Sequence, residues 1–442
     1  MHDTQPRRLV PRYLPDMLTV EEALARILGT AVPLGAEQVL LGDASGRVLA
    51  EPVVAGRRLP PWDNSAMDGY AVRAAEVAGA PLPVSATIAA GHAPEPLLVG
   101  TVARIMTGAP MPAGADAVIM REDAEESAAP GGLPYAHEVR FARAPQPGQH
   151  VRRAGEDVAP GDLLLDAGAP IGPGEIGLLA GIGRTIVSVH RRPRVAILST
   201  GDELLEPDRA PAPEGAGDGG GRRGAGAGAG PRSGKIIGSN SWALAAQCAE
   251  AGAVPTILPI ARDDREVIRA ALVEALRADV VLSSGGVSVG EFDFVKAALD
   301  DLGVEQSFWK VAMKPGKPIA FGRSGHVPVF GLPGNPASSM VTFELFVRPA
   351  LRRMLGVSPE RCTRPRAQVL LDREYRNDGG RRHFVRASLR RDGAHLYAAP
   401  LLRQGSGMLR SMVGVGALLD LDEASTPLGA GTPVWALLLD PV

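Results

Sequence analysis

ADVVLSSGGVSVGEFDF, residues 278–294, is the stretch that decides the fold class of this 442-residue chain. An apolar, β-branched run at 280–282 ends in a Ser/Gly turn at 283–290, and apolar side chains at helical spacing follow. A buried strand that turns through Ser and Gly into a helix leaves backbone N–H groups free, and such a cradle suits an anion. Glu291 and Asp293 follow the turn, so the stretch predicts a phosphate site with a hard cation or proton-transfer chemistry beside it.

The same alternation of segments continues on both sides of that stretch. Strand-like and helix-like segments follow one another at the spacing of βαβ units. This pattern predicts a doubly wound, largely parallel sheet with its site at the carboxyl ends of the strands. The expected strands are 195–198, 254–260, 279–283 and 327–330, and the expected helices are 240–251, 264–277, 291–302 and one from 336.

The whole chain is predicted to be a multi-domain α/β protein. Short strands between Gly/Pro turns predict a β-rich domain that is inserted into a mixed N-terminal domain, and the chain ends in a small β domain. A Gly/Ala/Pro tract cannot bury a core and is expected to be a flexible surface insert. The expected boundaries are 16–62 with 153–192 for the N-terminal domain, 63–152 for the inserted domain, 193–357 for the sheet domain, 206–234 for the insert and 358–442 for the C-terminal domain.

Composition argues against several classes of protein. The formal charge of −2 lacks the basic surplus of a nucleic-acid binder. No apolar run approaches the ~18 residues of a membrane span, and the N-terminus has no apolar signal-peptide core. Cys248 and Cys362 form neither a CxxC motif nor a disulfide framework, so we expect a cytoplasmic protein without structural zinc.

Three further turns carry chemistry similar to that of the opening stretch. STGDE at 199–203 closes a strand of the same sheet with hydroxyls, a Gly and carboxylates. WKVAMKPGKP at 309–318 holds lysines in a Pro-restricted loop that suits a polyanion. GLPGNP at 331–336 follows a strand and opens a helix, with Asn335 as N-cap and Pro336 at the first helical position. Several such turns at one sheet edge indicate a site for an anionic ligand.

Plainer interpretations of the acidic residues stay open. Asp63 and Asp68 in the motif PPWDNSAMDGYAVR lie beside Asn and Gly, where Asp is usually a turn former. The same interpretation applies to Glu156 and Asp157 in VRRAGEDV. These residues therefore indicate a site only in combination with the other motifs.

Two common motifs are absent. Gly285 and Gly290 have a spacing similar to that of a P-loop, but Glu291-Phe292 stands where Lys-Ser/Thr is needed, which argues against a Walker-type hydrolase. The eight histidines form no HExxH, which disfavours a histidine-ligated zinc enzyme. A site built from carboxylates favours Mg²⁺ or a similar hard ion.

Taken in order, seven motifs resemble the molybdopterin molybdenumtransferase family, which includes the C-terminal domain of gephyrin. They keep the family's order over most of the chain. The motifs are PPWDNSAMDGYAVR (60–73), RIMTGAPMPAGADAV (104–118), VRRAGEDV (151–158), STGDEL (199–204), SSGGVSVGEFD (283–293), WKVAMKPGKP (309–318) and GLPGNPASS (331–339).

The resemblance implies a reaction and an assembly. Molybdate would be inserted into the dithiolene of adenylylated molybdopterin, while Mg²⁺ or Zn²⁺ supports hydrolysis of the adenylate and release of AMP and molybdenum cofactor. The resemblance also implies a homodimer with its active site in a cleft shared between subunits, and it leaves contact with a molybdopterin adenylyltransferase open. Neither nucleic acid nor membrane is an expected partner.

The resemblance also assigns residues by motif. Cleaving a phosphoanhydride needs a metal held by carboxylates and donors for the phosphates, and both kinds of residue are present. The implied catalytic residues are Asp63, Thr107, Asp157, Glu203, Asp263 and Asp293, of which Asp63, Asp157, Glu203 and Asp293 would bind the metal. The implied substrate-binding residues are Ser283, Gly285, Gly286, Ser288, Lys310, Lys314, Lys317, Pro333, Pro336 and Ser406.

Two departures from the family pattern leave alternatives to the transferase open. The insert at 206–234 interrupts the sheet domain, and Gly238 stands where the family commonly has Asp. The chain could therefore be a divergent paralogue that acts as a molybdopterin-binding or scaffold protein. A molybdopterin adenylyltransferase would share the sheet domain, but the additional β domains argue against it.

Overall fold

The computed structural model describes residues 17–127, 136–209, 234–285 and 294–439. The chain forms two compact units. The first takes its residues from Met1–Glu37, Gly46–Ala50 and Ser188–Val442, and the second from Gln38–Ser45 and Glu51–Val187. No helix within the described ranges is long and apolar enough to cross a membrane.

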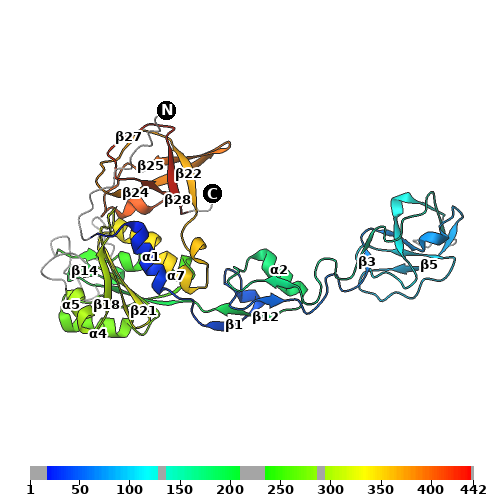
Figure 1. The fold of residues 1–442 in the computed structure, drawn as a ribbon, viewed down its shortest axis with the longest axis horizontal. Helices are drawn as coiled ribbons and strands as arrows, with labels where there is room; N and C mark the ends of the chain where they lie inside the picture. Colours follow the sequence, from blue (N-terminus) through cyan, green and yellow to red (C-terminus); the bar gives the residue numbers. More distant parts are fainter. Residues whose placement is uncertain (1–16, 128–135, 210–233, 286–293, 440–442) are drawn as a thin grey trace, which may run out of the picture. The chain divides into compact units, whose positions relative to one another are not determined.

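A six-stranded sheet forms the centre of the first unit (Figure 1). Its strands lie in the order β16-β13-β17-β21-β20-β18; the first four are parallel, whereas β20 runs antiparallel to both of its neighbours. The bounds are β13 Arg194–Ser199, β16 Val254–Ile257, β17 Val280–Ser284, β18 Glu305–Lys310, β20 Pro318–Ser324 and β21 Val327–Leu332. The predicted largely parallel sheet is confirmed, and β18 and β20 are strands that the sequence analysis did not predict.

Helices cover both faces of this sheet, as predicted. Because side chains alternate along a strand, Val195 and Ile197 of β13 enter one core while Ala196 and Leu198 enter the other. The first face is covered by α1 (Val20–Thr30), α3 (Asn240–Glu250) and the consecutive segments α6 (Pro336–Thr342), η7 (Phe343–Val347) and α7 (Arg348–Met354), and the second by α4 (Arg265–Ala275) and α5 (Phe294–Asp301).

A buried carboxylate ties two of these helical segments together. Glu344 lies in the π-helical segment η7 and is 4% exposed. It accepts hydrogen bonds from Gln247 of α3 at 2.7 Å and from Arg364 at 2.8 Å. A buried charge with such partners is costly to break, so α3 is held rigidly against the helix that begins at Pro336.

The C-terminal residues form a second six-stranded sheet, which closes on itself because β24 also pairs with β26. Its order is β19-β24-β25-β22-β28-β26. The bounds are β19 Met313–Lys314, β22 Arg366–Leu371, β24 Arg382–Asp392, β25 His395–Pro400, β26 Ala417–Leu421 and β28 Pro433–Leu438. The prediction of a plain loop for the lysine stretch was wrong, because β19 comes from this stretch and pairs with β24.

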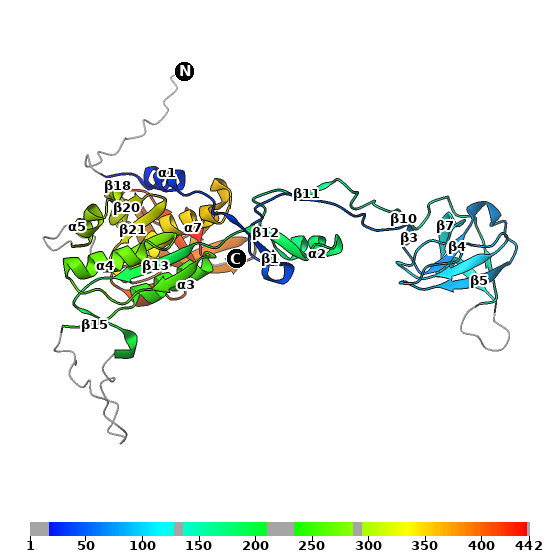
Figure 2. The ribbon, with the colours of Figure 1, turned by 90° about the horizontal axis from the view of Figure 1, so that it is seen from below.

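The second unit contains a six-stranded sheet in the order β7-β4-β6-β5-β9-β8 (Figure 2). The same unit has two further pairs of short antiparallel strands. In these, β3 (Asn64–Ser65) pairs with β10 (Val151–Arg152), and β2 (Val53–Val54) pairs with β11 (Leu163–Leu165). The sheet strands are β4 Gly69–Val72, β5 Leu82–Ile88, β6 Val102–Ile105, β7 Ala117–Met120, β8 Ala124–Glu126 and β9 Glu138–Phe141, and the helix α2 spans Pro173–Gly181.

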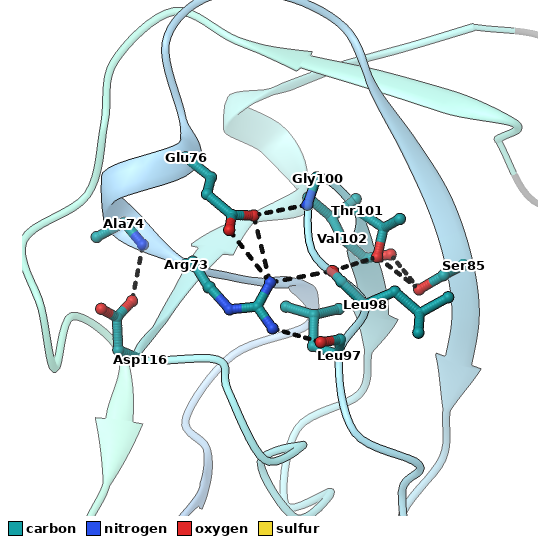
Figure 3. A network of polar contacts seen from close by, with 10 residues as sticks. All are labelled: Arg73, Ala74, Glu76, Ser85, Leu97, Leu98, Gly100, Thr101, Val102 and Asp116. Carbon is teal, nitrogen blue, oxygen red and sulfur yellow. Dashed lines mark hydrogen bonds and ion pairs between the residues drawn. The ribbon is translucent and has the colours of Figure 1, made fainter.

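One arginine anchors the end of β4 in this sheet (Figure 3). The Arg73 guanidinium donates to the carbonyls of Leu97 and Leu98 and pairs with Glu76, 3.3 Å away. Glu76 in turn accepts from the backbone N–H of Gly100 at 2.9 Å. These bonds fix the loop at 97–100 to the end of β4. They thereby stabilise the strand whose other end carries the residues around Asp68.

Asp279, at the start of β17, should make the stability of the first unit depend on pH. Burial alone would raise its pKa, but hydrogen bonds from Arg191 and Arg194 lower the pKa from 3.8 to about 2. Since the folded pKa lies below the unfolded one, this stabilisation is present above about pH 4 and is lost as pH falls toward 2. Asp279→Asn should lower the free energy of unfolding by about 2 kcal/mol at neutral pH.

Urea unfolding of wild type and variant at neutral pH and near pH 3 tests this expectation. The difference between the two proteins should shrink at the lower pH. A difference of the same size at both values would show that the arginine pairs do not set the pKa of Asp279.

Candidate functional site

Three turns meet at the carboxyl edge of the first unit's sheet. The strand register places Ser199 opposite Ser284, and Ser284 opposite Leu332. The turns that follow β13, β17 and β21 therefore lie side by side, as predicted from the strand order. We call them, together with Asn240 and Asp263, the sheet-edge site.

Close backbone contacts fix these turns. Gly285 has φ +93°, and a Cβ there would lie 3.2 Å from the carbonyl oxygen of Thr200. Its N–H donates to the Leu332 carbonyl at 3.2 Å. Gly is thus favoured at 285 by the left-handed backbone and by the tight contact with the Thr200 carbonyl.

Asn240, the first residue of α3, ties two of the turns together. Its side-chain amide donates one hydrogen to Ser284 Oγ at 2.8 Å and the other to the Gly334 carbonyl at 2.7 Å. The sequence analysis placed Asn240 only at the start of the helix expected at 240–251. Its partners lie 44 and 94 residues away, and no local pattern indicates such a contact.

Asn240→Ala should therefore loosen the sheet-edge site. Removing two hydrogen bonds of about 1 kcal/mol each should raise the dissociation constant for a phosphorylated ligand by roughly 10-fold or more. Isothermal titration measures the effect, with adenylylated molybdopterin, the substrate that the resemblance implies, as the ligand. Gln247→Ala, which removes hydrogen bonds from the same helix further along, is the matched control and should destabilise the fold without weakening binding. Equal weakening in both variants would contradict the assignment.

Carboxylates line a cavity of about 760 Å³ beside the first turn. Asp202 and Asp263 are bonded reciprocally, each accepting the other's backbone N–H at 3.3–3.4 Å. Glu203 folds back over Gly201, where a Cβ would lie 2.5 Å from its carboxylate. Lys235 and Arg262 line the same cavity, so it offers groups of both charges to a ligand.

The predicted lysines lie at the same edge. β18 runs in the same direction as β21, so Lys310 at its end lies at the carboxyl edge. Lys314 donates to Asp378 at 3.0 Å, and Gly316 packs against Thr342 of α6. All three predicted lysines, including Lys317, are only partly buried, and Lys314 already has Asp378 as a partner.

The neighbouring histidine carries no charge near neutral pH. His383 is 2% exposed, and burial together with the nearby Lys314 lowers its pKa to about 4. A neutral imidazole adds no further cation beside the lysines.

The turn at 333–336 leads into α6 as predicted, with Asn335 as the N-cap residue and Pro336 as the first residue of the helix. Asn335 occupies the N-cap position of α6, but its side chain makes no capping hydrogen bond. Instead, it donates to Ser406 Oγ at 3.2 Å, and the Ser406 carbonyl accepts the N–H of Ala337 at 3.0 Å. The structure thus brings Ser406 to the turn that holds Pro333 and Pro336.

A buried arginine that the sequence analysis missed lies beneath Ser406. Arg386 is fully buried, and it donates to Gln404 Oε1 at 3.1 Å and to the Gly405 carbonyl at 3.4 Å. Its Nη2 has no partner among the described residues, and burial lowers its pKa. A buried guanidinium without a carboxylate leaves a charge that no described residue balances. The apolar neighbours of Arg386 in its strand give no such signal.

The second unit holds the predicted residues Asp63, Thr107 and Asp157. We call the three motifs that carry them, at 60–73, 104–118 and 151–158, the loop site. Asp63 accepts hydrogen bonds from Arg153 at 2.7 Å and from the Ala154 N–H at 2.8 Å, and these bonds lower its pKa. The N–H of Asp157 donates to Leu59. The motifs at 60–73 and 151–158 are therefore side by side in this unit.

Thr107 completes the loop site. Its backbone N–H and its hydroxyl both donate to Asp68 Oδ1, at 2.7 and 2.8 Å. The Gly108 N–H donates to the Ser65 carbonyl at 2.8 Å. The motif at 104–118 thus joins the other two, and Asp68 is more than a turn former.

The described residues contain no group of three or more His, Cys, Asp or Glu side chains that could hold a metal ion. Gly286, Ser288 and Asp293 lie outside the described residues, so their predicted roles stay predictions. Both oxygens of Asp63 accept one hydrogen bond each, and its predicted role as a metal ligand stays a prediction.

The chain has a doubly wound sheet with the sheet-edge site, and two further six-stranded β sheets. This architecture is that of a multi-domain α/β protein with a candidate ligand site at the sheet edge. Family models match along the chain: the MoeA N-terminal region (domain I and II) at 18–183, a probable molybdopterin binding domain at 196–353 and the MoeA C-terminal region (domain IV) at 368–439. The chain belongs to the molybdopterin molybdenumtransferase family, as its motifs predict.

Relatives and a solved structure agree with this assignment. Molybdopterin molybdenumtransferase 2 of Mycobacterium tuberculosis is 38% identical over 418 residues, covering 90% of this chain and 94% of the relative. The molybdopterin molybdenumtransferase of Nostoc sp. is 36% identical, covering 98% and 96%. A crystal structure of the molybdopterin biosynthesis moeA protein from Pyrococcus horikoshii OT3 matches with a TM-score of 0.75 and 29% identity, covering 96% of this chain and 100% of that one.

Proposed function

We propose that this chain is the enzyme that completes molybdenum cofactor by inserting molybdate into the dithiolene of adenylylated molybdopterin, with release of AMP. The observation that carries the proposal is the convergence of three backbone turns, a cavity lined by acidic and basic side chains, and three lysines at one sheet edge. A phosphorylated pterin adenylate and an oxyanion need such a combination.

The residues have distinct tasks in this reaction. The turn N–H groups and the lysines bind the phosphates and the molybdate dianion. Water attacks the phosphoanhydride, so that AMP leaves and the terminal phosphate stays on the pterin. Two Mo–S bonds form as one oxo ligand of molybdate leaves as water with the two thiol protons. The cavity of mixed charge lies beside the first turn, where the adenylate and its counter-ion would be held.

The proposed metal is Mg²⁺ or Zn²⁺, which would neutralise charge on the phosphates. Oxygen ligands from carboxylates suit Mg²⁺, and Glu203 and Asp263 at the sheet-edge site are of this type. Since the described residues contain no three-ligand group, the other ligands would be Asp293, a carboxylate of the loop site such as Asp157, or the substrate's phosphates.

The proposed assembly is a homodimer in which the loop site of one chain faces the sheet-edge site of the other. What supports this is the division of the family's motifs between the two units, three in the second and four in the first. The proposed compartment is the cytoplasm, and a molybdopterin adenylyltransferase would supply the substrate there. The alternative of a molybdopterin-binding scaffold is not favoured, because the relatives named above are transferases.

The change from the family's Asp to Gly238 is not forced by a lack of space. A Cβ at this position would lie 3.5 Å from Ile260 and 3.6 Å from the Leu205 carbonyl, which are ordinary contacts. An Asp, as in the family pattern, would therefore fit at this position. Gly238 lacks the carboxylate of that Asp but does not distort the turn.

Reconstitution of an apo-molybdoenzyme tests the proposal. Purified chain, adenylylated molybdopterin, Mg²⁺ and molybdate should together produce cofactor that activates the apoenzyme. No activation, with a known molybdenumtransferase active in the same assay, would refute the proposal.

A further inference from the structure

The Asp68–Thr107 contact has a chemical consequence for the loop site. A threonine hydroxyl has one proton to donate, and Thr107 donates it to Asp68 Oδ1 at 2.8 Å. The same oxygen also accepts the Thr107 N–H at 2.7 Å. With its proton committed, the exposed Thr107 Oγ can only accept hydrogen bonds from a ligand or water.

Asp68 is itself held in place from both ends of β4. Its carbonyl accepts the Arg121 N–H at 3.1 Å. The next residue, Gly69, begins β4 so close to β7 that a Cβ would lie 2.0 Å from the Ile119 carbonyl oxygen. The far end of the strand is fixed by the Arg73 network (Figure 3). The backbone of Asp68 therefore has little freedom.

Hydrogen bonds from Thr107 also keep Asp68 ionised. The backbone bond, followed by the hydroxyl bond, lowers the pKa of this exposed carboxyl. An ionised carboxylate has no proton of its own, so the direction of the hydroxyl bond is fixed: Thr107 donates and Asp68 accepts.

We propose that Asp68 is a positioning residue for the reaction: it orients the Thr107 hydroxyl as a hydrogen-bond acceptor for the water that attacks the phosphoanhydride. The assignment deepens the proposed function and rests on it. In this arrangement Asp68 acts on the reaction only through Thr107. Its loss should therefore slow turnover and leave substrate binding nearly unchanged.

Four variants test this assignment by steady-state AMP release. Asp68→Ala and Thr107→Val should each lower kcat by about 10- to 100-fold, with KM within about threefold of wild type. Asp68→Asn keeps an oxygen that can accept both bonds, so its kcat should stay within about fivefold of wild type. The double variant of Asp68→Ala and Thr107→Val should be no slower than Thr107→Val alone. Asp162→Ala removes a similar carboxylate bond, to the Ala159 N–H, and is the matched control with unchanged kcat.

A second readout does not depend on activity. Hydrogen exchange at the Thr107 amide should be slow in wild type and Asp68→Asn and fast in Asp68→Ala. Either of two results would overturn the positioning role. In the first, Asp68→Asn turns over as slowly as Asp68→Ala. In the second, Asp68→Ala lowers the kcat of the Thr107→Val variant by as large a factor as it lowers the kcat of wild type. A wild-type chain that releases no AMP would overturn the proposed function, and this assignment with it, even where the exchange pattern is the expected one.

Discussion

Mixing two inactive variants, Asp157→Asn and Lys310→Ala, should restore about a quarter of wild-type activity. Asp157 belongs to the loop site in the second unit and Lys310 to the sheet-edge site in the first. Each substitution alone should lower AMP release by about 100-fold or more, because it removes a charge from the reacting groups. If the variants form homodimers with shared sites and pair at random, half of the dimers contain one chain of each variant. Each such heterodimer has one intact site out of two, which gives a quarter of the wild-type sites.

The control for this experiment pairs two variants of the same unit. Asp157→Asn mixed with Thr107→Val should recover nothing, since every loop site then carries a substitution. Native mass spectrometry establishes whether heterodimers have formed. Heterodimers without recovered activity would contradict the shared site and leave each active site within one chain.

Arg386→Met should weaken substrate binding by about 100-fold without destabilising the protein. The guanidinium is fully buried, and its Nη2 has no partner among the described residues. An uncompensated buried charge opposes folding, so an apolar side chain of similar length should leave the free energy of unfolding equal or higher. A ligand phosphate near Ser406 would supply the missing partner, and this interaction is what the variant loses.

An arginine on the same strand provides the comparison. Arg382 is paired with Asp420 at 2.6 Å, so Arg382→Met should destabilise the fold and leave binding intact. Titration with adenylylated molybdopterin and urea unfolding measure both quantities. If Arg386→Met bound substrate normally and unfolded more easily, Arg386 would be a structural residue and no part of the site.

The sheet was predictable from sequence because its strands are short apolar runs that end in Ser, Gly and Asp. The start of α4 was also predictable to within one residue: Asp264, where the expected helix begins, is its N-cap and accepts the N–H groups of Glu266 and Val267 at 3.0 Å. β18 escaped prediction because it is an edge strand, with Glu305 and Gln306 exposed and no alternation of apolar residues. Its hydrogen-bond partner β20 is needed to make it a strand.

The candidate site was predictable as motifs but not as contacts. Lys310 and Glu203 stand in patterns that resemble a family, and strand order alone brings their turns to one edge. The bonds of Asn240 and the unpaired Arg386 depend on residues far away in sequence, so no local pattern encodes them. Asp68 looked like an ordinary turn residue until Thr107, 39 residues later, was placed beside it.

The most direct test of the account is molybdate-dependent AMP release by the purified chain. With adenylylated molybdopterin and Mg²⁺, AMP should appear only slowly until molybdate is added, and one AMP should be released per molybdenum incorporated. Lys310→Ala and Asp157→Asn should each abolish the molybdate-dependent release. Release that ignored molybdate, or that survived both substitutions, would contradict the claim that the two sites together insert molybdenum.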